Sequence, residues 1–139
     1  MKILNFCLMG ITLLILNSCE NDNLELSKDQ LSQTQWSGTL SFEEANVPYN
    51  CDITINFETP SRGRYVTSDL DTKSEYSQQT TIEYTIDKKV VSIFGGVHNI
   101  LLGDWYIYQL SKEQLTLKRD MDISTESTLT LNRTSLLSH

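Results

Sequence analysis

The amino-acid sequence predicts an all-β protein: an eight-stranded antiparallel up-and-down barrel with a short N-terminal helical turn. Apolar and polar residues alternate in eight successive segments, which is the pattern of strands with one buried and one exposed face. No segment of comparable length repeats with the helical period, so consecutive strands are expected to pair antiparallel. Long and short links also alternate along the chain, which favours a meander closed into a barrel.

The first predicted strand covers residues 35–43 and sets the pattern for the others. Trp36, Gly38, Leu40 and Phe42 share one face, and the residues between them are polar. The following strands are expected over residues 51–57, 62–67, 76–86, 89–94, 104–110, 114–119 and 128–133.

A short helix is expected directly before the first strand. Ser27 and Gln30 have the spacing of a capping box, in which each side chain accepts a hydrogen bond from the backbone N–H of the other residue. Leu31 is the first apolar residue after them, so the sequence predicts one or two helical turns over residues 28–33.

An open sheet of eight such strands would have two unpaired edges and a bare apolar face. Closure into a barrel buries both, and a two-layer sandwich is the alternative. The links over residues 44–50, 68–75, 95–103 and 120–127 are long, and those over residues 58–61, 87–88 and 111–113 are short. Alternate links of a meander lie at opposite ends, so the long links are expected to form a mouth and the short links a base.

Residues 1–18 have the features of a lipoprotein signal peptide. Lys2 supplies the positive charge, and the apolar run that follows is shorter than the ~20 residues that span a bilayer. The segment from Leu16 to Cys19 resembles a lipobox, the cleavage motif of bacterial lipoproteins. The resemblance implies cleavage before Cys19, acylation of that residue, and a lipidated tether over residues 19–27. The expected location is the bacterial cell envelope, anchored by lipid to the outer membrane on its periplasmic or its surface face.

The predicted barrel resembles the lipocalin-like domains of bacterial lipoproteins. The resemblance rests on Trp36-Ser-Gly at the start of the first strand, on the eight-stranded meander, and on the hairpin over residues 104–117. It covers about residues 30–134, with Trp-x-Gly in place of the Gly-x-Trp of lipocalins. Lipocalins carry an arginine near the end of the last strand that packs on this tryptophan, and Arg133 occupies the matching place. The resemblance therefore implies that Trp36 and Arg133 close the barrel.

Length and composition limit the number of domains and the kinds of partner. The chain has 139 residues, 39% hydrophobic and 21% charged, which is typical of one globular domain, here over residues 28–134 with a tail over residues 135–139. A net charge of -7 argues against binding to nucleic acid. Cys51 is the one cysteine after Cys19, and it is in phase with Ile53, so we expect a buried thiol and no disulfide within the mature chain.

Charged residues divide between the two expected ends of the barrel. Acidic residues predominate in the long links, whereas lysines and arginines, such as Lys88, Lys89 and Lys112, predominate in the short links. The first strand starts at the base, so the tether is expected to leave from there. We therefore expect the basic base to face an anionic membrane surface and the acidic mouth to point away from it.

The sequence contains no pattern expected of an enzyme. It has two histidines, no nucleophile elbow and no histidine pair with zinc spacing, so neither catalysis nor a metal or other cofactor is expected. The expected role is binding a small apolar or glycan-derived ligand at the mouth. The alternative is a solid-core accessory or inhibitor module that binds another envelope protein through its loops. The candidate mouth residues are Tyr49, Leu70, His98, Ile100, Leu101, Leu102 and Met121.

Overall fold

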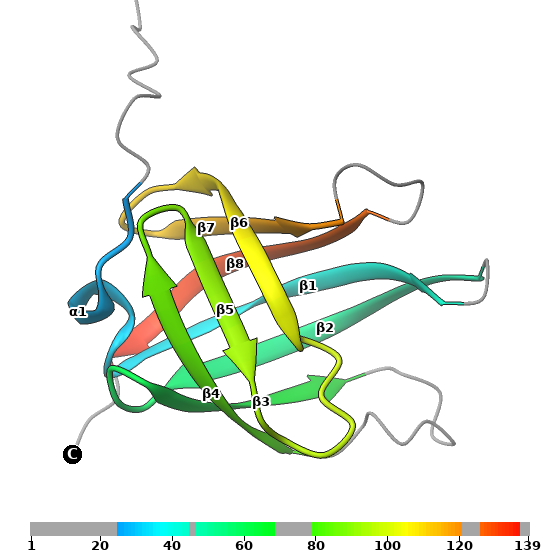
Figure 1. Cartoon of the computed structure of the whole chain (residues 1–139), viewed down its shortest axis with the longest axis horizontal. Helices are drawn as coiled ribbons and strands as arrows, with labels where there is room; N and C mark the ends of the chain where they lie inside the picture. Colours follow the sequence, from blue (N-terminus) through cyan, green and yellow to red (C-terminus); the bar gives the residue numbers. More distant parts are fainter. Residues whose placement is uncertain (1–24, 45–46, 69–78, 121–125, 137–139) are drawn as a thin grey trace, which may run out of the picture.

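The computed structural model describes residues 25–44, 47–68, 79–120 and 126–136, and every structural statement below concerns these residues. They form one helix and eight strands (Figure 1). The elements are α1 (Lys28–Leu31), β1 (Thr34–Glu44), β2 (Val47–Phe57), β3 (Arg62–Ser68), β4 (Thr80–Asp87), β5 (Val90–Phe94), β6 (Gly103–Leu110), β7 (Gln114–Arg119) and β8 (Ser127–Leu136).

The eight strands form a closed barrel in sequence order. Each strand pairs antiparallel with its neighbours, and β1 pairs with β8 to close the ring. In this closing pair, Trp36 lies opposite Arg133 and Leu40 lies opposite Leu129. The eight-stranded up-and-down barrel is thus confirmed, and the two-layer sandwich is excluded.

The helix before the first strand is a single turn with the expected cap. The Ser27 Oγ accepts a hydrogen bond from the Gln30 N–H at 3.3 Å, and the Gln30 Oε1 accepts one from the Ser27 N–H at 2.7 Å. The helix ends at Leu31, earlier than the expected residue 33, because Ser32 leaves the helical region with φ -52 and ψ 137. Leu26, expected to belong to a solvated tether, is only 5% exposed and packs into the core.

The prediction of a long loop over residues 44–50 is wrong. β1 and β2 continue in register as far as Glu44 and Val47, so they form one long hairpin that extends beyond the body of the barrel (Figure 1). Pro48, which lacks an N–H group, is tolerated there because β2 pairs with β3 only from Asp52 onward.

Other strand ends differ by a few residues from their expected places. β4 starts at Thr80 instead of residue 76, and residues 76–78 lie outside the described part of the chain. β8 continues to Leu136, two residues beyond the expected end of the domain, because Ser135 still pairs with Gln35 on β1.

The inward side chains fill the interior of the barrel. Large residues from all eight strands are fully buried or nearly so, and they include Trp36, Leu40, Ile55, Phe57, Tyr65, Ile82, Tyr84, Ile93, Trp105, Leu117 and Leu131. Phe57 and Tyr84 meet edge to face with ring centroids 5.1 Å apart. An eight-stranded barrel is just wide enough for side chains to fill it, and the inward side chains of the described residues make such a core.

The phenol of Tyr84 makes the stability of this core sensitive to alkaline pH. Tyr84 is 0% exposed and its hydroxyl donates a hydrogen bond to the Thr59 carbonyl at 2.6 Å. Burial raises the pKa of Tyr84 from 10.0 to about 12, so folding favours the neutral phenol. Its contribution is present below pH 10, and about 3 kcal/mol is lost as the pH rises through about 12.

Chemical denaturation at pH 8 to 12 measures this loss. We expect Tyr84→Phe to cost about 1 kcal/mol at pH 8, where it removes one hydrogen bond. The same variant is expected to lose less stability than the wild type above pH 10. Tyr108→Phe is the control, because Tyr108 is 61% exposed and should leave the alkaline slope unchanged. Identical slopes for Tyr84→Phe and the wild type would show that Tyr84 is not the responsible group.

Candidate functional site at the loop end of the barrel

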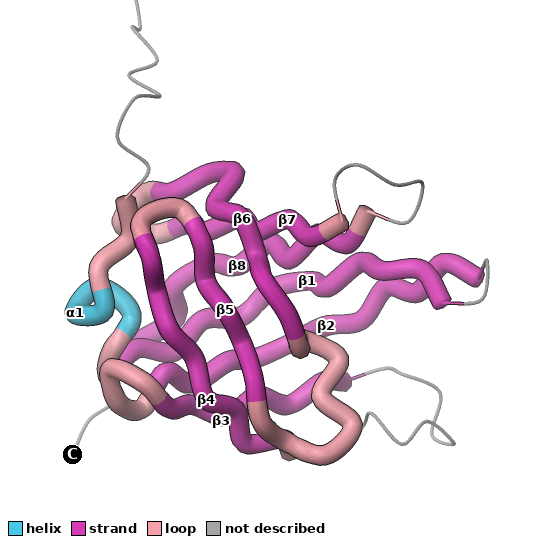
Figure 2. The backbone as a smooth tube through the Cα atoms, viewed as in Figure 1, coloured by secondary structure: helices cyan, strands magenta, loops and turns pink. Residues whose placement is uncertain are grey.

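The loop between β5 and β6 lies at the end of the barrel opposite α1 (Figure 2). We call residues 95–102 the plug loop. It starts with Gly95 and Gly96, which have φ values of 75 and 78 that favour glycine. A Cβ on Gly96 would lie 2.6 Å from the Thr81 carbonyl oxygen, so glycine also lets the loop lie directly against β4.

The end of the plug loop turns into the barrel. Leu101 is 0% exposed, and its carbonyl accepts a hydrogen bond from the Trp105 indole Nε1–H at 2.7 Å. The Ile100 N–H donates to the Tyr65 hydroxyl at 3.1 Å, and the Leu101 N–H donates to the Asn99 side chain at 3.0 Å. Groups from β3, β6 and the loop itself therefore hold the apolar Leu101 side chain in place over the core.

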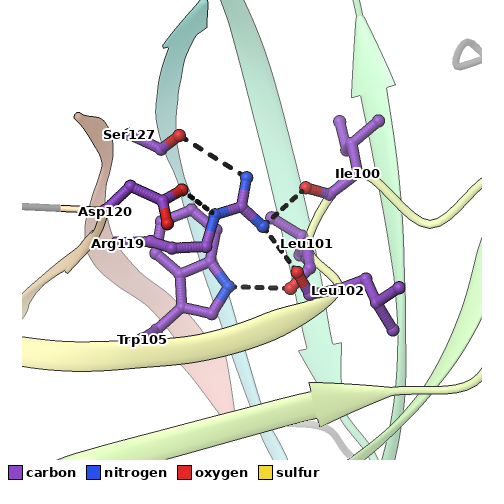
Figure 3. A network of polar contacts seen from close by, with 7 residues as sticks. All are labelled: Ile100, Leu101, Leu102, Trp105, Arg119, Asp120 and Ser127. Atoms are coloured by element: carbon purple, nitrogen blue, oxygen red, sulfur yellow. Dashed lines mark hydrogen bonds and ion pairs between the residues drawn. The ribbon is translucent and has the colours of Figure 1, made fainter. Parts of the chain in front are cut away.

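Arg119, the last residue of β7, also binds the plug loop (Figure 3). Its guanidinium lies over the Trp105 ring, 4.5 Å from the centroid. Its Nη1 donates hydrogen bonds to the carbonyl oxygens of Leu102 at 2.6 Å and Ile100 at 3.3 Å. Arg119 thus donates to two carbonyls of the plug loop that lie outside the strands, one of them partly buried.

Acidic and hydroxyl groups complete the surroundings of Arg119. The Asp120 Oδ2 lies 3.3 Å from the Arg119 Nε, and the Ser127 hydroxyl lies 3.5 Å from its Nη2 (Figure 3). Burial lowers the pKa of Arg119, and the Asp120 carboxylate partly opposes that shift. Since an arginine stays charged in proteins, the Arg119 cation is a permanent part of the closed mouth.

The structure places the candidate mouth residues in different environments. Leu101 is part of the core, Ile100 is partly buried against it, and Leu102 is 56% exposed. Tyr49 lies on β2 rather than in a loop, where it stacks on Phe42 with ring centroids 5.2 Å apart. Leu70 and Met121, like Cys19, lie outside the described residues.

His98 belongs to a groove on the outside of the loop end. This groove lies between residues 79–83 and residues 95–98 and has a volume of about 400 Å³. Its polar groups are amide, hydroxyl, carboxylate and imidazole side chains, and Val97 supplies apolar surface. The groove does not enter the interior, because Ile82 and Ile93 below it are buried in the core.

Exposed apolar side chains gather at the same end of the molecule. The large hydrophobic residues that are exposed on the ends of strands or in the plug loop are Val47 at 48%, Val66 at 42%, Phe94 at 40%, Val97 at 80% and Leu102 at 56%. Tyr106 and Tyr108 are the other exposed members of this class among the described residues, and they lie on the outer face of β6. The loop end is therefore more apolar than its acidic sequence suggests.

Sequence reasoning missed Arg119 as the residue that closes the mouth. Arg119 was expected at the end of the strand over residues 114–119, where it was counted among the charges beside a long link, and it shares an inward phase with Leu115 and Leu117. The two-residue spacing from Leu117 was the sequence feature that could have predicted an inward-facing Arg119. The arginine–tryptophan stack that the described residues form is Arg119 over Trp105, whereas Arg133 is the cross-strand partner of Trp36.

The described residues offer little for catalysis or metal binding. No group of three or more histidine, cysteine, aspartate or glutamate side chains is placed to hold a metal ion within this part of the chain. Cys51 is 2% exposed, as expected of a buried thiol, and burial raises its pKa, which disfavours the reactive thiolate. No helix among the described residues has the length and apolar character needed to cross a bilayer.

Comparison with known proteins adds no relative to this picture. No family model matches the chain, and neither curated proteins nor solved structures gave a match. The class that the structure defines is the closed, solid, eight-stranded up-and-down β-barrel.

Proposed function

We propose that this protein is a non-catalytic, lipocalin-like lipoprotein of the bacterial envelope that binds another envelope protein through its loop end. The observation that carries the proposal is the closed mouth: Leu101 and Trp105 are both 0% exposed beneath Arg119. Within the described residues the inward side chains fill the barrel, and this supports binding on the outside rather than in the interior. This favours the solid-core module over a ligand-carrying barrel.

The chemistry of the loop end supports a protein partner. Val97 and Leu102 project from the plug loop, and Val47 projects from the β1–β2 hairpin, so apolar groups come from separate elements that the barrel holds rigidly. Exposed apolar groups rimmed by polar ones are the usual composition of protein interfaces. The carboxylates of Asp104 and Asp120, both exposed, provide such a rim.

The lipid anchor gives this binding surface an orientation. The described chain enters at α1, at the end of the barrel opposite the plug loop (Figure 1). Acylation of Cys19 would therefore attach the base to the membrane and direct the loop end away from it. Two or three acyl chains are sufficient for stable anchoring.

Site-specific photo-crosslinking in the native membrane tests this proposal. We expect a photoreactive residue at Val97 or Leu102 to give the same discrete protein adduct, and one at Lys112, at the base, to give none. Cys19→Ser is expected to move the protein from the membrane fraction to the soluble fraction and to lower the yield of the adduct. Absence of any adduct at the loop end, or equal adducts at both ends, would contradict the proposed interface.

A small glycan-derived ligand in the outer groove is the second candidate. The groove volume of about 400 Å³ falls within the range of ligand sites, about 300–1,000 Å³. Its hydroxyl, amide and carboxylate groups fit a sugar better than an apolar ligand. A glycan that co-purifies with the wild type and is lost from Thr81→Trp, which fills the groove, would favour this candidate over a protein partner.

A further inference from the structure

A second pocket lies at the base of the barrel, between the segment that enters α1 and the turn between β6 and β7. It has a volume of about 270 Å³. Leu26, Trp36 and Leu110 give it an apolar floor, and Gln30, Lys112 and Arg133 give it a polar rim. We call it the base pocket. It shares no residue with the mouth or the outer groove, and its volume is smaller than that of a typical site for a whole drug-sized ligand.

The rim of the base pocket is cationic. Its lining contains Lys112 and Arg133 and no acidic residue, and neither cation forms an ion pair within the described chain. The backbone N–H of Arg133 donates to the Glu113 carbonyl at 2.9 Å, which fixes the β6–β7 turn against β8. Unpaired cations above an apolar floor are complementary to an anion that carries an apolar group.

The turn between β4 and β5, which carries Lys88 and Lys89, contacts the segment that lines the pocket. The Leu26 N–H donates to the Lys88 carbonyl at 3.4 Å, and the Ile107 N–H donates to the Lys89 carbonyl at 2.8 Å. Asp87 and Glu113 are the acidic residues of these two turns, and both are exposed. Cations from the β6–β7 turn and from β8 therefore line the pocket, in a chain whose net charge is -7.

The base pocket also lies where the chain enters the fold. Leu26, which lines it, is seven residues after Cys19. An extended chain covers at most ~3.6 Å per residue, so the pocket would lie within about 25 Å of a lipid on Cys19. This step rests on the proposed lipid anchor, which would hold the pocket at the membrane surface.

We propose that the base pocket binds the headgroup of an anionic phospholipid. The phosphate would accept hydrogen bonds from Arg133 and Lys112, and the glycerol with the first methylenes of the acyl chains would cover Leu26 and Trp36. The protein would then rest on the membrane with its base seated on lipid and its loop end directed outward.

Two indole resonances provide a direct test. The chain has two tryptophans, and the Trp36 Nε1–H donates to the Thr34 hydroxyl at 2.7 Å, while the Trp105 Nε1–H marks the loop end. The non-acylated chain, made with Cys19→Ser, is titrated by NMR with monomeric dihexanoyl phosphatidylglycerol. We expect the Trp36 indole and the backbone amides of Lys112 and Arg133 to shift in a saturable way, and the Trp105 indole to stay in place.

Matched variants identify the groups that bind. Arg133→Gln and Lys112→Gln are each expected to weaken the phosphatidylglycerol affinity about tenfold or more, because each removes a charged hydrogen-bond donor. Lys118→Gln removes the same charge at the edge of the mouth, where Lys118 pairs with Glu126, and should leave the affinity unchanged. An unchanged Trp105 indole resonance shows that each variant is folded.

Several results would overturn the proposal. A shift of equal affinity with dihexanoyl phosphatidylcholine would show an apolar pocket without headgroup recognition, and an equal response to hexanoate or inorganic phosphate would show a general anion site. Absence of a saturable shift of the Trp36 indole resonance would show that the lipid does not bind in the base pocket. The envelope-protein interface is tested separately by the crosslinks at Val97, so either proposal can fail while the other stands.

Discussion

Gly38→Ala is expected to lower the free energy of unfolding by about 3 kcal/mol or more, because it forces apart the strand pair that closes the barrel. A Cβ at this position would lie 1.8 Å from the Thr130 carbonyl oxygen and 3.0 Å from the Leu131 Cα. Both atoms belong to the backbone of β8, directly opposite Gly38, so no side-chain rotation can relieve the overlap. β1 and β8 must separate, and the hydrogen bonds of the closing pair must lengthen or break.

Urea denaturation followed by tryptophan fluorescence measures this loss. Thr39→Ala is the matched control, because Thr39 is the next residue of β1 and its side chain is exposed. We expect the control to stay within about 0.5 kcal/mol of the wild type. A Gly38→Ala protein as stable as the Thr39→Ala control would mean that β1 and β8 do not approach this closely.

Arg119→Met is expected to destabilise the protein by about 3 kcal/mol. Methionine keeps the apolar stem but removes the guanidinium over Trp105 and the donors to the Ile100 and Leu102 carbonyls. Because these bonds hold the loop segment whose Leu101 side chain is buried in the core, the plug loop is expected to loosen, and an apolar dye should then bind to the exposed interior. Thermal unfolding and dye fluorescence measure the two effects.

Lys118→Met is the control for Arg119→Met. Lys118 is the preceding residue and also lies over an aromatic ring, 4.4 Å from the centroid of Tyr108. Within the described chain its ammonium pairs with Glu126 and makes no hydrogen bond to the plug loop, so its loss is expected to have a much smaller effect and to leave dye binding unchanged. Similar losses for the two variants would show that Arg119 is an ordinary surface cation.

Much of the fold follows from local sequence pattern. Period-two alternation placed Trp36, Leu40 and Ile55 on the inner face, and all three are buried. The number of strands and the need to pair both edges of the sheet were enough to predict a closed barrel. The capping box of α1 depends on two residues three positions apart, so it too could be predicted locally.

The features that were missed depend on contacts between side chains of different strands. A long link was expected over residues 44–50, but the β1–β2 hairpin continues through this segment, where Tyr49 stacks on Phe42. The burial of Leu101 depends on Trp105 of β6 and on Arg119 of the paired strand β7, and the sequence pattern does not specify how the plug loop meets them. The sequence therefore placed Leu101 among candidate mouth residues, whereas the structure buries it in the core.

Hydrogen exchange at the Trp105 indole N–H tests the closed mouth most directly. This group is buried and donates to the Leu101 carbonyl at 2.7 Å, so in the wild type we expect it to exchange as slowly as the most protected amides of β1 and β8. In Arg119→Met we expect exchange at least tenfold faster, with little change at the Trp36 indole. Exchange of the wild-type Trp105 indole as fast as that of an exposed loop amide would contradict the account, because the mouth would then be open to water and to ligands.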